Sequence, residues 1–72
     1  MIRFSELIDN IEFDGDILVR VWDEESETYT REFTRYDDLT EAELEPLWNL
    51  EVTHIYPYSI FPYIATVIEL RA

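Results

Sequence analysis

The chain of 72 residues has no cysteine, no lysine, a single glycine and a single histidine. Without cysteine it forms no disulfide, and it offers neither a thiolate metal ligand nor a thiol nucleophile. No stretch approaches the roughly 18 apolar residues of a membrane-spanning helix. The first residues also lack the basic and apolar regions of a secretory signal peptide. We therefore expect no membrane association, with the cytoplasm as the default compartment.

The lack of lysine leaves five arginines against 17 aspartates and glutamates, a formal net charge of −12. Such a charge repels nucleic acid and anionic membranes and attracts basic protein surfaces. The chain is nevertheless no disordered acidic tail, because 47% of its residues are hydrophobic and 15% are aromatic. Disorder requires low hydrophobicity together with high charge. We expect residues 1–72 to form a single small acidic domain.

Hydrophobic periodicity predicts the first half of the fold. Apolar residues with helical spacing indicate a short amphipathic helix over residues 3–11, and Asp14-Gly15 marks the turn after it. Two alternating runs, residues 16–22 and 28–36, are separated by a polar tip. This pattern predicts a β-hairpin, whose three arginines we expect to pair with carboxylates across the strands.

The second half begins with a capping box from Thr40 to Glu43, which predicts a helix. Pro46 should kink that helix or end it after about one and a half to two and a half turns. Two further strands, residues 51–56 and 64–71, are expected to be joined by an aromatic connection flanked by prolines. The order α-β-β-α-β-β predicts an α+β domain, in which one four-stranded antiparallel sheet carries two short helices on one face.

No residue pattern points to catalysis or to a metal centre. His54 lies in a predicted strand, and no serine stands in a nucleophile elbow or a glycine-rich loop. The segment from Asn10 to Gly15 matches the opening of an EF-hand loop, but Val21 stands where that loop needs its bidentate glutamate. A lone histidine without cysteine does not make a typical zinc site. We therefore expect no enzymatic activity, no cofactor and no metal.

The acidic residues cluster at the first turn, at the tip of the first hairpin and around the second helix. Carboxylates at strand or helix spacing lie about 5–7 Å apart, which is comparable to every second phosphate of a DNA strand. They can therefore imitate nucleic acid, whereas the alternative is an acidic surface that only confers solubility. The acidic candidates for partner binding are Asp23, Glu24, Glu25 and Glu27 at the tip, and Asp38, Glu41 and Glu45 near the helix.

The connection between the last two strands is rich in aromatic side chains. If these rings are exposed, they form an apolar patch of the composition found in protein–protein hot spots. The alternative is that they fold back into the core. We select Tyr58, Phe61 and Tyr63 as the apolar candidates for partner binding.

Small size, extreme acidity without lysine, an α+β body and the lack of an enzyme motif resemble one class of proteins. The chain is similar in character to the small acidic inhibitors of phages and other mobile elements, such as anti-CRISPR and anti-restriction proteins that mimic nucleic acid. The resemblance extends over the whole chain and rests on no motif. It implies a partner in a bacterial host, namely the basic nucleic-acid-binding surface of a defence complex. The alternative is a small interaction or self-assembly module, with either a monomer or a homodimer allowed.

Overall fold

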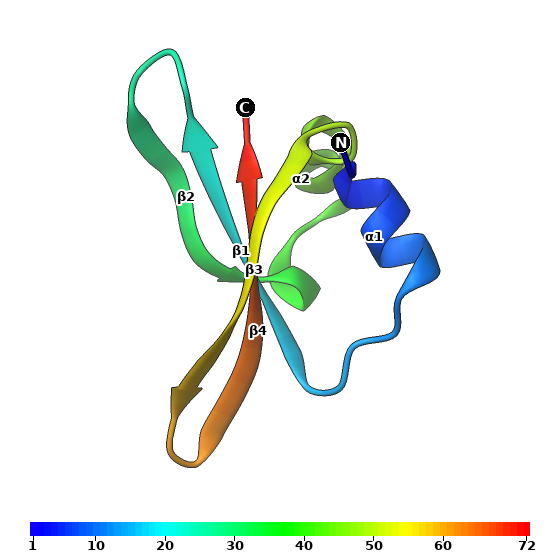
Figure 1. Cartoon of the computed structure of the whole chain (residues 1–72), viewed down its shortest axis with the longest axis vertical. Helices are drawn as coiled ribbons and strands as arrows, with labels where there is room; N and C mark the ends of the chain where they lie inside the picture. Colours follow the sequence, from blue (N-terminus) through cyan, green and yellow to red (C-terminus); the bar gives the residue numbers. More distant parts are fainter.

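Two short helices cover one face of a four-stranded sheet in the computed structural model, which describes residues 1–72 (Figure 1). The order α-β-β-α-β-β and the α+β class confirm the sequence prediction. None of the helices has the length and hydrophobicity that crossing a membrane requires. The elements are α1 (Phe4–Asn10), β1 (Asp16–Asp23), β2 (Thr28–Arg35), the 3₁₀ turn η1 (Tyr36–Asp38), α2 (Glu41–Leu44), the 3₁₀ turn η2 (Glu45–Leu47), β3 (Glu51–Ile60) and β4 (Tyr63–Arg71).

The strands lie in the order β2-β1-β4-β3, so two antiparallel hairpins join through their inner strands. These inner strands, β1 and β4, run parallel. The expectation of an entirely antiparallel sheet is wrong for this pair. Parallel strands are usually covered on both faces and therefore contain consecutive apolar residues, whereas a strand with one solvent-exposed face alternates apolar and polar residues. Only β1 and β4 contain neighbouring residues that are both buried, namely Leu18 with Val19 and Val67 with Ile68.

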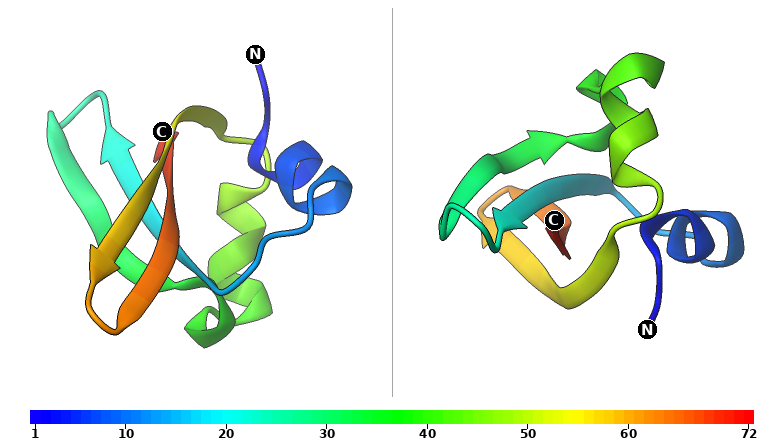
Figure 2. Two further views of the ribbon diagram at one scale, coloured as in Figure 1. Left: turned by 60° about the horizontal axis from the view of Figure 1, so that its bottom comes forward. Right: turned by 90° about the horizontal axis from the view of Figure 1, so that it is seen from above.

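The main core lies between the sheet and the helices, which stand on the same side of the sheet (Figure 2). Phe4 of α1 is fully buried, and its ring stacks on Trp48 with 5.2 Å between the ring centroids. The N–H groups of Phe4 and Ser5 donate to the carbonyls of Leu50 and Trp48, which fixes the start of α1. The buried residues of this core are Phe4, Leu7, Val19, Val21, Leu39, Leu44, Leu47, Ile68 and Leu70.

The capping box predicted at the start of α2 is present. The Thr40 hydroxyl accepts from the N–H of Glu43 at 3.2 Å, and the Glu43 carboxylate accepts from the N–H of Thr40 at 3.0 Å. The backbone hydrogen bond from Thr40 is the main reason why the pKa of Glu43 is lowered. The α-helix ends at Leu44, and Pro46 lies in the 3₁₀ turn that follows, as the proline predicts.

The prediction that residues 57–63 form an aromatic connection outside the strands is wrong, because both strands continue through this segment. β3 extends to Ile60 and β4 begins at Tyr63, which leaves only Phe61-Pro62 as the turn. Pro57 does not interrupt β3, because this strand lies at the edge of the sheet and one of its sides needs no ladder donor. The residues chosen as a loop are thus part of a long hairpin.

We predict that Thr40→Ala lowers the free energy of unfolding by about 1 kcal/mol, because it removes the hydroxyl that caps α2. Urea denaturation followed by circular dichroism measures this change. Thr30→Ala is the matched control, since Thr30 is exposed in β2 and its hydroxyl makes no hydrogen bond. Equal losses in the two variants would show that the cap contributes nothing specific.

Candidate binding site on the open face of the sheet

The face of the sheet turned away from the helices is covered only by side chains of the strands themselves. Leu18, Ala65 and Val67 are buried there beneath Tyr56 and Tyr58 of β3. This cover depends on a strong curl of the sheet, which is visible from its end in Figure 2.

The curl brings the two edge strands together over the open face. Phe33 of β2 contacts Tyr58 of β3 with 5.5 Å between the ring centroids, although β2 and β3 lie at opposite edges of the sheet.

Arg20 of β1 lies at the centre of this face. Its guanidinium stacks 3.5 Å from the centroid of the Tyr29 ring and lies 5.0 Å from that of Phe33. It also donates to the Tyr56 hydroxyl and to the Glu32 carboxylate, each at 3.4 Å. One side chain of β1 therefore connects both edge strands. The predicted pairing of the hairpin arginines with carboxylates across the strands is confirmed for Arg20 and for Arg35, which pairs with Asp16 of β1 at 3.4 Å.

Two bulges in β2 make that arrangement possible. The register with β1 shifts on either side of Val21, and each shift places one extra residue in β2. In a regular strand, Tyr29, Arg31 and Phe33 would share one face. Here Tyr29 and Phe33 face Arg20, whereas Arg31 turns to the helix side and pairs with Glu43 at 3.5 Å.

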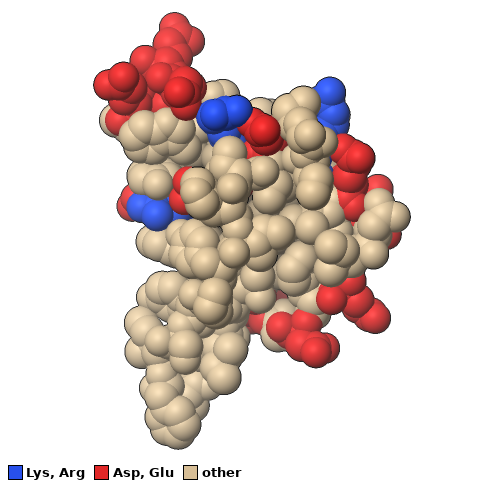
Figure 3. Space-filling view, viewed as in Figure 1, with Lys and Arg blue, Asp and Glu red and all other residues tan.

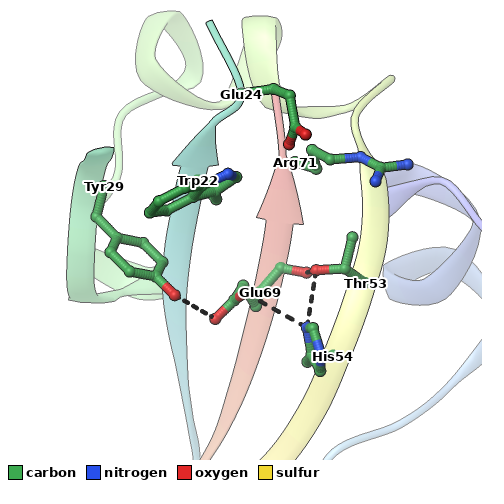
Figure 4. Close-up of a pocket in the computed structure, with 7 residues that line it drawn as sticks. All are labelled: Trp22, Glu24, Tyr29, Thr53, His54, Glu69 and Arg71. Carbon is green, nitrogen blue, oxygen red and sulfur yellow. Dashed lines mark hydrogen bonds and ion pairs between the residues drawn. The ribbon is translucent and has the colours of Figure 1, made fainter. Parts of the chain in front are cut away.

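Glu69 of β4 links the centre of the open face to a pocket (Figure 4). Its side chain is only 12% exposed, lies 3.6 Å from Arg20, and accepts from the Tyr29 hydroxyl at 3.3 Å. The pKa of Tyr29 is raised, first by its desolvation on this face and then by the negative charge of Glu69. The pocket has a volume of about 280 Å³ and is lined by Trp22, Glu24, Tyr29, Thr53, His54, Glu69 and Arg71.

His54 is an exposed residue of β3 at the rim of the pocket, which confirms its prediction as a strand residue. Its Nδ1 atom lies 3.3 Å from the Glu69 carboxylate and 3.1 Å from the Thr53 hydroxyl. The hydroxyl of Thr53 donates to the backbone carbonyl of Glu69. No three acidic or histidine side chains converge in a way that would hold a metal ion.

The acidic tip predicted from the sequence borders this pocket. The Asp23 carboxylate shapes the tip, because it accepts from the N–H of Glu25 at 3.2 Å and from the Ser26 hydroxyl at 2.9 Å. Glu24, Glu25 and Glu27 are exposed, and Glu24 also lines the pocket. Figure 3 shows acidic side chains gathered at this end of the molecule.

The other two groups of candidates lie elsewhere. Asp38, Glu41 and Glu45 are exposed around α2, on the helix side of the sheet, so they lie apart from the acidic tip (Figures 1 and 2). Tyr58, Phe61 and Tyr63 belong to the β3–β4 hairpin, which projects from the opposite end of the molecule (Figure 1). The structure therefore does not unite the ten predicted residues on one surface.

The aromatic residues of the β3–β4 hairpin were expected either to form an exposed patch or to fold back into the core, and each expectation applies to some of them. Tyr58 is half-buried on the open face, whereas Phe61 at the turn is 95% exposed. Tyr63, Ile60 and Ile64 are exposed as well. Residues 55–68 contain no aspartate, glutamate or arginine, and this end of the molecule is uncharged in Figure 3.

Ion pairs divide the carboxylates into two sets. Five of the 17 pair with arginines and lie mostly in the sheet, which leaves twelve without such a partner. The five paired residues are Asp16, Glu32, Glu43, Glu51 and Glu69. All seven acidic candidates belong to the unpaired set.

Comparison of the chain with protein-family models, with curated proteins and with solved structures gives no match. The candidate site therefore depends on its geometry alone. Sequence reasoning missed Trp22, Tyr29 and Glu69, which come from three different strands. The one sequence feature that these three residues share is that each lies in a strand of alternating pattern, on the side opposite the apolar core residues.

We predict that Arg20→Lys lowers the free energy of unfolding by about 0.5–2 kcal/mol, because an ammonium cannot reproduce the stacked planar guanidinium. The measurement is urea denaturation, with near-ultraviolet circular dichroism to report on the packing of the aromatic rings. Arg35→Lys is the control, because Arg35 is 48% exposed and has one ion pair, with Asp16. The central role of Arg20 is refuted if the two variants are equally stable.

Proposed function

We propose that this protein is a non-enzymatic inhibitor that binds the basic, nucleic-acid-binding surface of a partner protein. The observation that carries the proposal is the division of the carboxylates. Arginines pair with four carboxylates of the sheet and with Glu43 of α2, whereas the seven acidic candidates at the acidic tip and around α2 have no ion-pair partner. Exposed carboxylates of this kind attract basic surfaces over a distance.

The acidic tip is the part best suited to direct contact. It lies at the end of the β1–β2 hairpin, where a partner reaches it without touching the helices (Figure 1). Trp22 lies next to Asp23 and faces the pocket, so an aromatic surface adjoins the charges. Interfaces gain most of their affinity from such aromatic residues, and charges at the rim mainly raise the association rate.

The carboxylates around α2 have a different part in this proposal. They lie on the other side of the sheet from the pocket, so a partner seated at the acidic tip does not touch them directly. Their contribution is attraction at a distance, which salt weakens, since the screening length is about 8 Å at physiological ionic strength. A host defence complex that binds DNA or RNA presents the kind of basic surface that both groups attract.

The test is capture of partners from a bacterial lysate at low salt by the tagged protein, with identification by mass spectrometry. We expect nucleic-acid-binding proteins that are displaced both by a salt step and by competing DNA or RNA. A variant with Glu24, Glu25 and Glu27 changed to glutamine should lose most of this capture, because the contact charges are gone.

The matched control changes Asp9 and Asp14 to asparagine and Glu12 to glutamine, which removes three exposed charges away from the acidic tip. This control should retain the captured proteins. Equal losses in the two variants would mean that total charge, and not the acidic tip, governs binding. Recovery of no nucleic-acid-binding protein from the wild type would contradict the proposed function.

A second candidate function, self-assembly, is favoured by the exposed end of the β3–β4 hairpin. Copies with a net charge of −12 repel each other, and this end is free of charged residues. Two copies that meet there bury Phe61, Ile60 and Ile64, while their acidic tips point away from each other. Exposed apolar patches of this kind mark protein interaction sites.

Self-assembly predicts a dimer that strengthens with salt, because screening weakens the repulsion while apolar contacts remain. Sedimentation velocity over a concentration series at low and high salt measures the association. Phe61→Ser should abolish it, whereas Ile11→Ser should not, because Ile11 is also an exposed apolar residue but lies outside the hairpin. A wild-type chain that stays monomeric throughout excludes this function.

A further inference from the structure

The pocket on the open face has the size and the walls to receive one side chain. Its volume of about 280 Å³ lies at the lower limit of the about 300–1,000 Å³ typical of small-molecule sites. Trp22 and Tyr29 form an aromatic wall in which the two rings meet edge to face, with 4.9 Å between their centroids. The carboxylate of Glu69 lies beside this wall (Figure 4). An aromatic wall next to a carboxylate is the environment that binds an organic cation.

The charges around the pocket favour a cation as well. Glu24 at the rim has no ion-pair partner, and the acidic tip continues outward from it. Arg71 also lines the pocket, but its guanidinium pairs with Glu51 at the start of β3. The Nδ1 atom of His54 lies 3.3 Å from the Glu69 carboxylate on the side of β3, away from the aromatic wall. The remaining local field is therefore negative.

Arg20 shows which cation suits this chemistry. Its guanidinium already stacks on the Tyr29 ring at 3.5 Å and lies 3.6 Å from the same Glu69 carboxylate. A carboxylate has about four acceptor positions, and the only side-chain hydrogen bond that Glu69 accepts comes from Tyr29, while Arg20 and His54 lie beside it at ion-pair distances. A planar guanidinium combines stacking with paired hydrogen bonds, which a lysine ammonium does not.

We infer that this pocket binds an arginine side chain of the basic partner, with its guanidinium against Trp22 and between the carboxylates of Glu24 and Glu69. This inference rests on the proposed function and assigns the residue type on which the partner is anchored. The chain itself does not supply the occupant. It has no lysine, and the arginine outside the sheet, Arg3, donates to the carbonyl of Asn49.

The experiment is a titration of the ¹⁵N-labelled protein with N-acetyl-arginine methylamide, followed by ¹H–¹⁵N correlation spectra. We expect saturable shifts of the Trp22 indole signal and of the backbone signals of Tyr29 and Glu69. The lysine analogue should bind several-fold more weakly, because it cannot stack as a plane. The glutamine analogue should cause no shift, because it has no charge.

Two variants and one control locate the binding. Glu69→Gln should weaken binding of the arginine probe roughly tenfold, because it removes a charged acceptor. Glu24→Gln, at an exposed position without side-chain partners, should weaken it without any effect on folding. Glu41→Gln removes the same charge near α2 and should leave the affinity unchanged. The spectra themselves report whether each variant is folded.

Shifts distributed over all acidic segments, or equal weakening by Glu41→Gln and Glu69→Gln, would overturn the inference. Equal binding of the arginine and lysine probes would overturn the assignment to arginine. The failure of this inference is distinguishable from failure of the proposed function. If the probe does not bind but the lysate capture still depends on the acidic tip, only the pocket assignment is wrong.

Discussion

The parallel pairing of β1 with β4 is the interaction on which the rest of the structure depends. Both strands carry buried side chains on both faces, so the sheet needs cover on two sides. Two short helices cover only one of them. The other side is covered because the sheet curls and its edge strands pack around Arg20. A small chain thereby buries its inner strands and still leaves a pocket on the side that lacks helices.

The same pairing also determines where the two hairpin turns lie. The β1–β2 turn follows the end of β1, and the β3–β4 turn precedes the start of β4. If these strands were antiparallel, both turns would lie at one end, and the acidic tip would adjoin the aromatic residues. Because they are parallel, the turns lie at opposite ends (Figure 1). The acidic and the aromatic candidates for partner binding therefore lie apart for a topological reason.

Local features of the fold could be predicted from the sequence, and features that combine distant strands could not. Periodicity located the first helix and the β1–β2 hairpin, and the capping box of Thr40 and Glu43 located the second helix. The last two strands were expected, although the hairpin between them is longer than predicted. The consecutive apolar residues of β1 and β4, such as Leu18 and Val19, indicated in the sequence that these two strands are the inner ones. The bulges of β2 had no comparable signal, because they depend on which side chains Arg20 and Glu43 attract. Without these bulges, neither the position of Tyr29 nor the pocket follows.

Parallel inner strands also explain why the pocket adjoins the acidic tip. The carboxyl ends of β1 and β4 lie side by side, so Trp22 and Glu24 meet Glu69 and Arg71 at one end of the sheet. Ligands of open parallel sheets bind at the carboxyl ends of the strands, since side chains and turns from neighbouring strands converge there. In this protein a single parallel pair is enough to produce that convergence. Because the β1–β2 turn starts from the same end, Glu24 lines the pocket and the rest of the acidic tip lies beside it, which is the arrangement that the proposed basic partner requires.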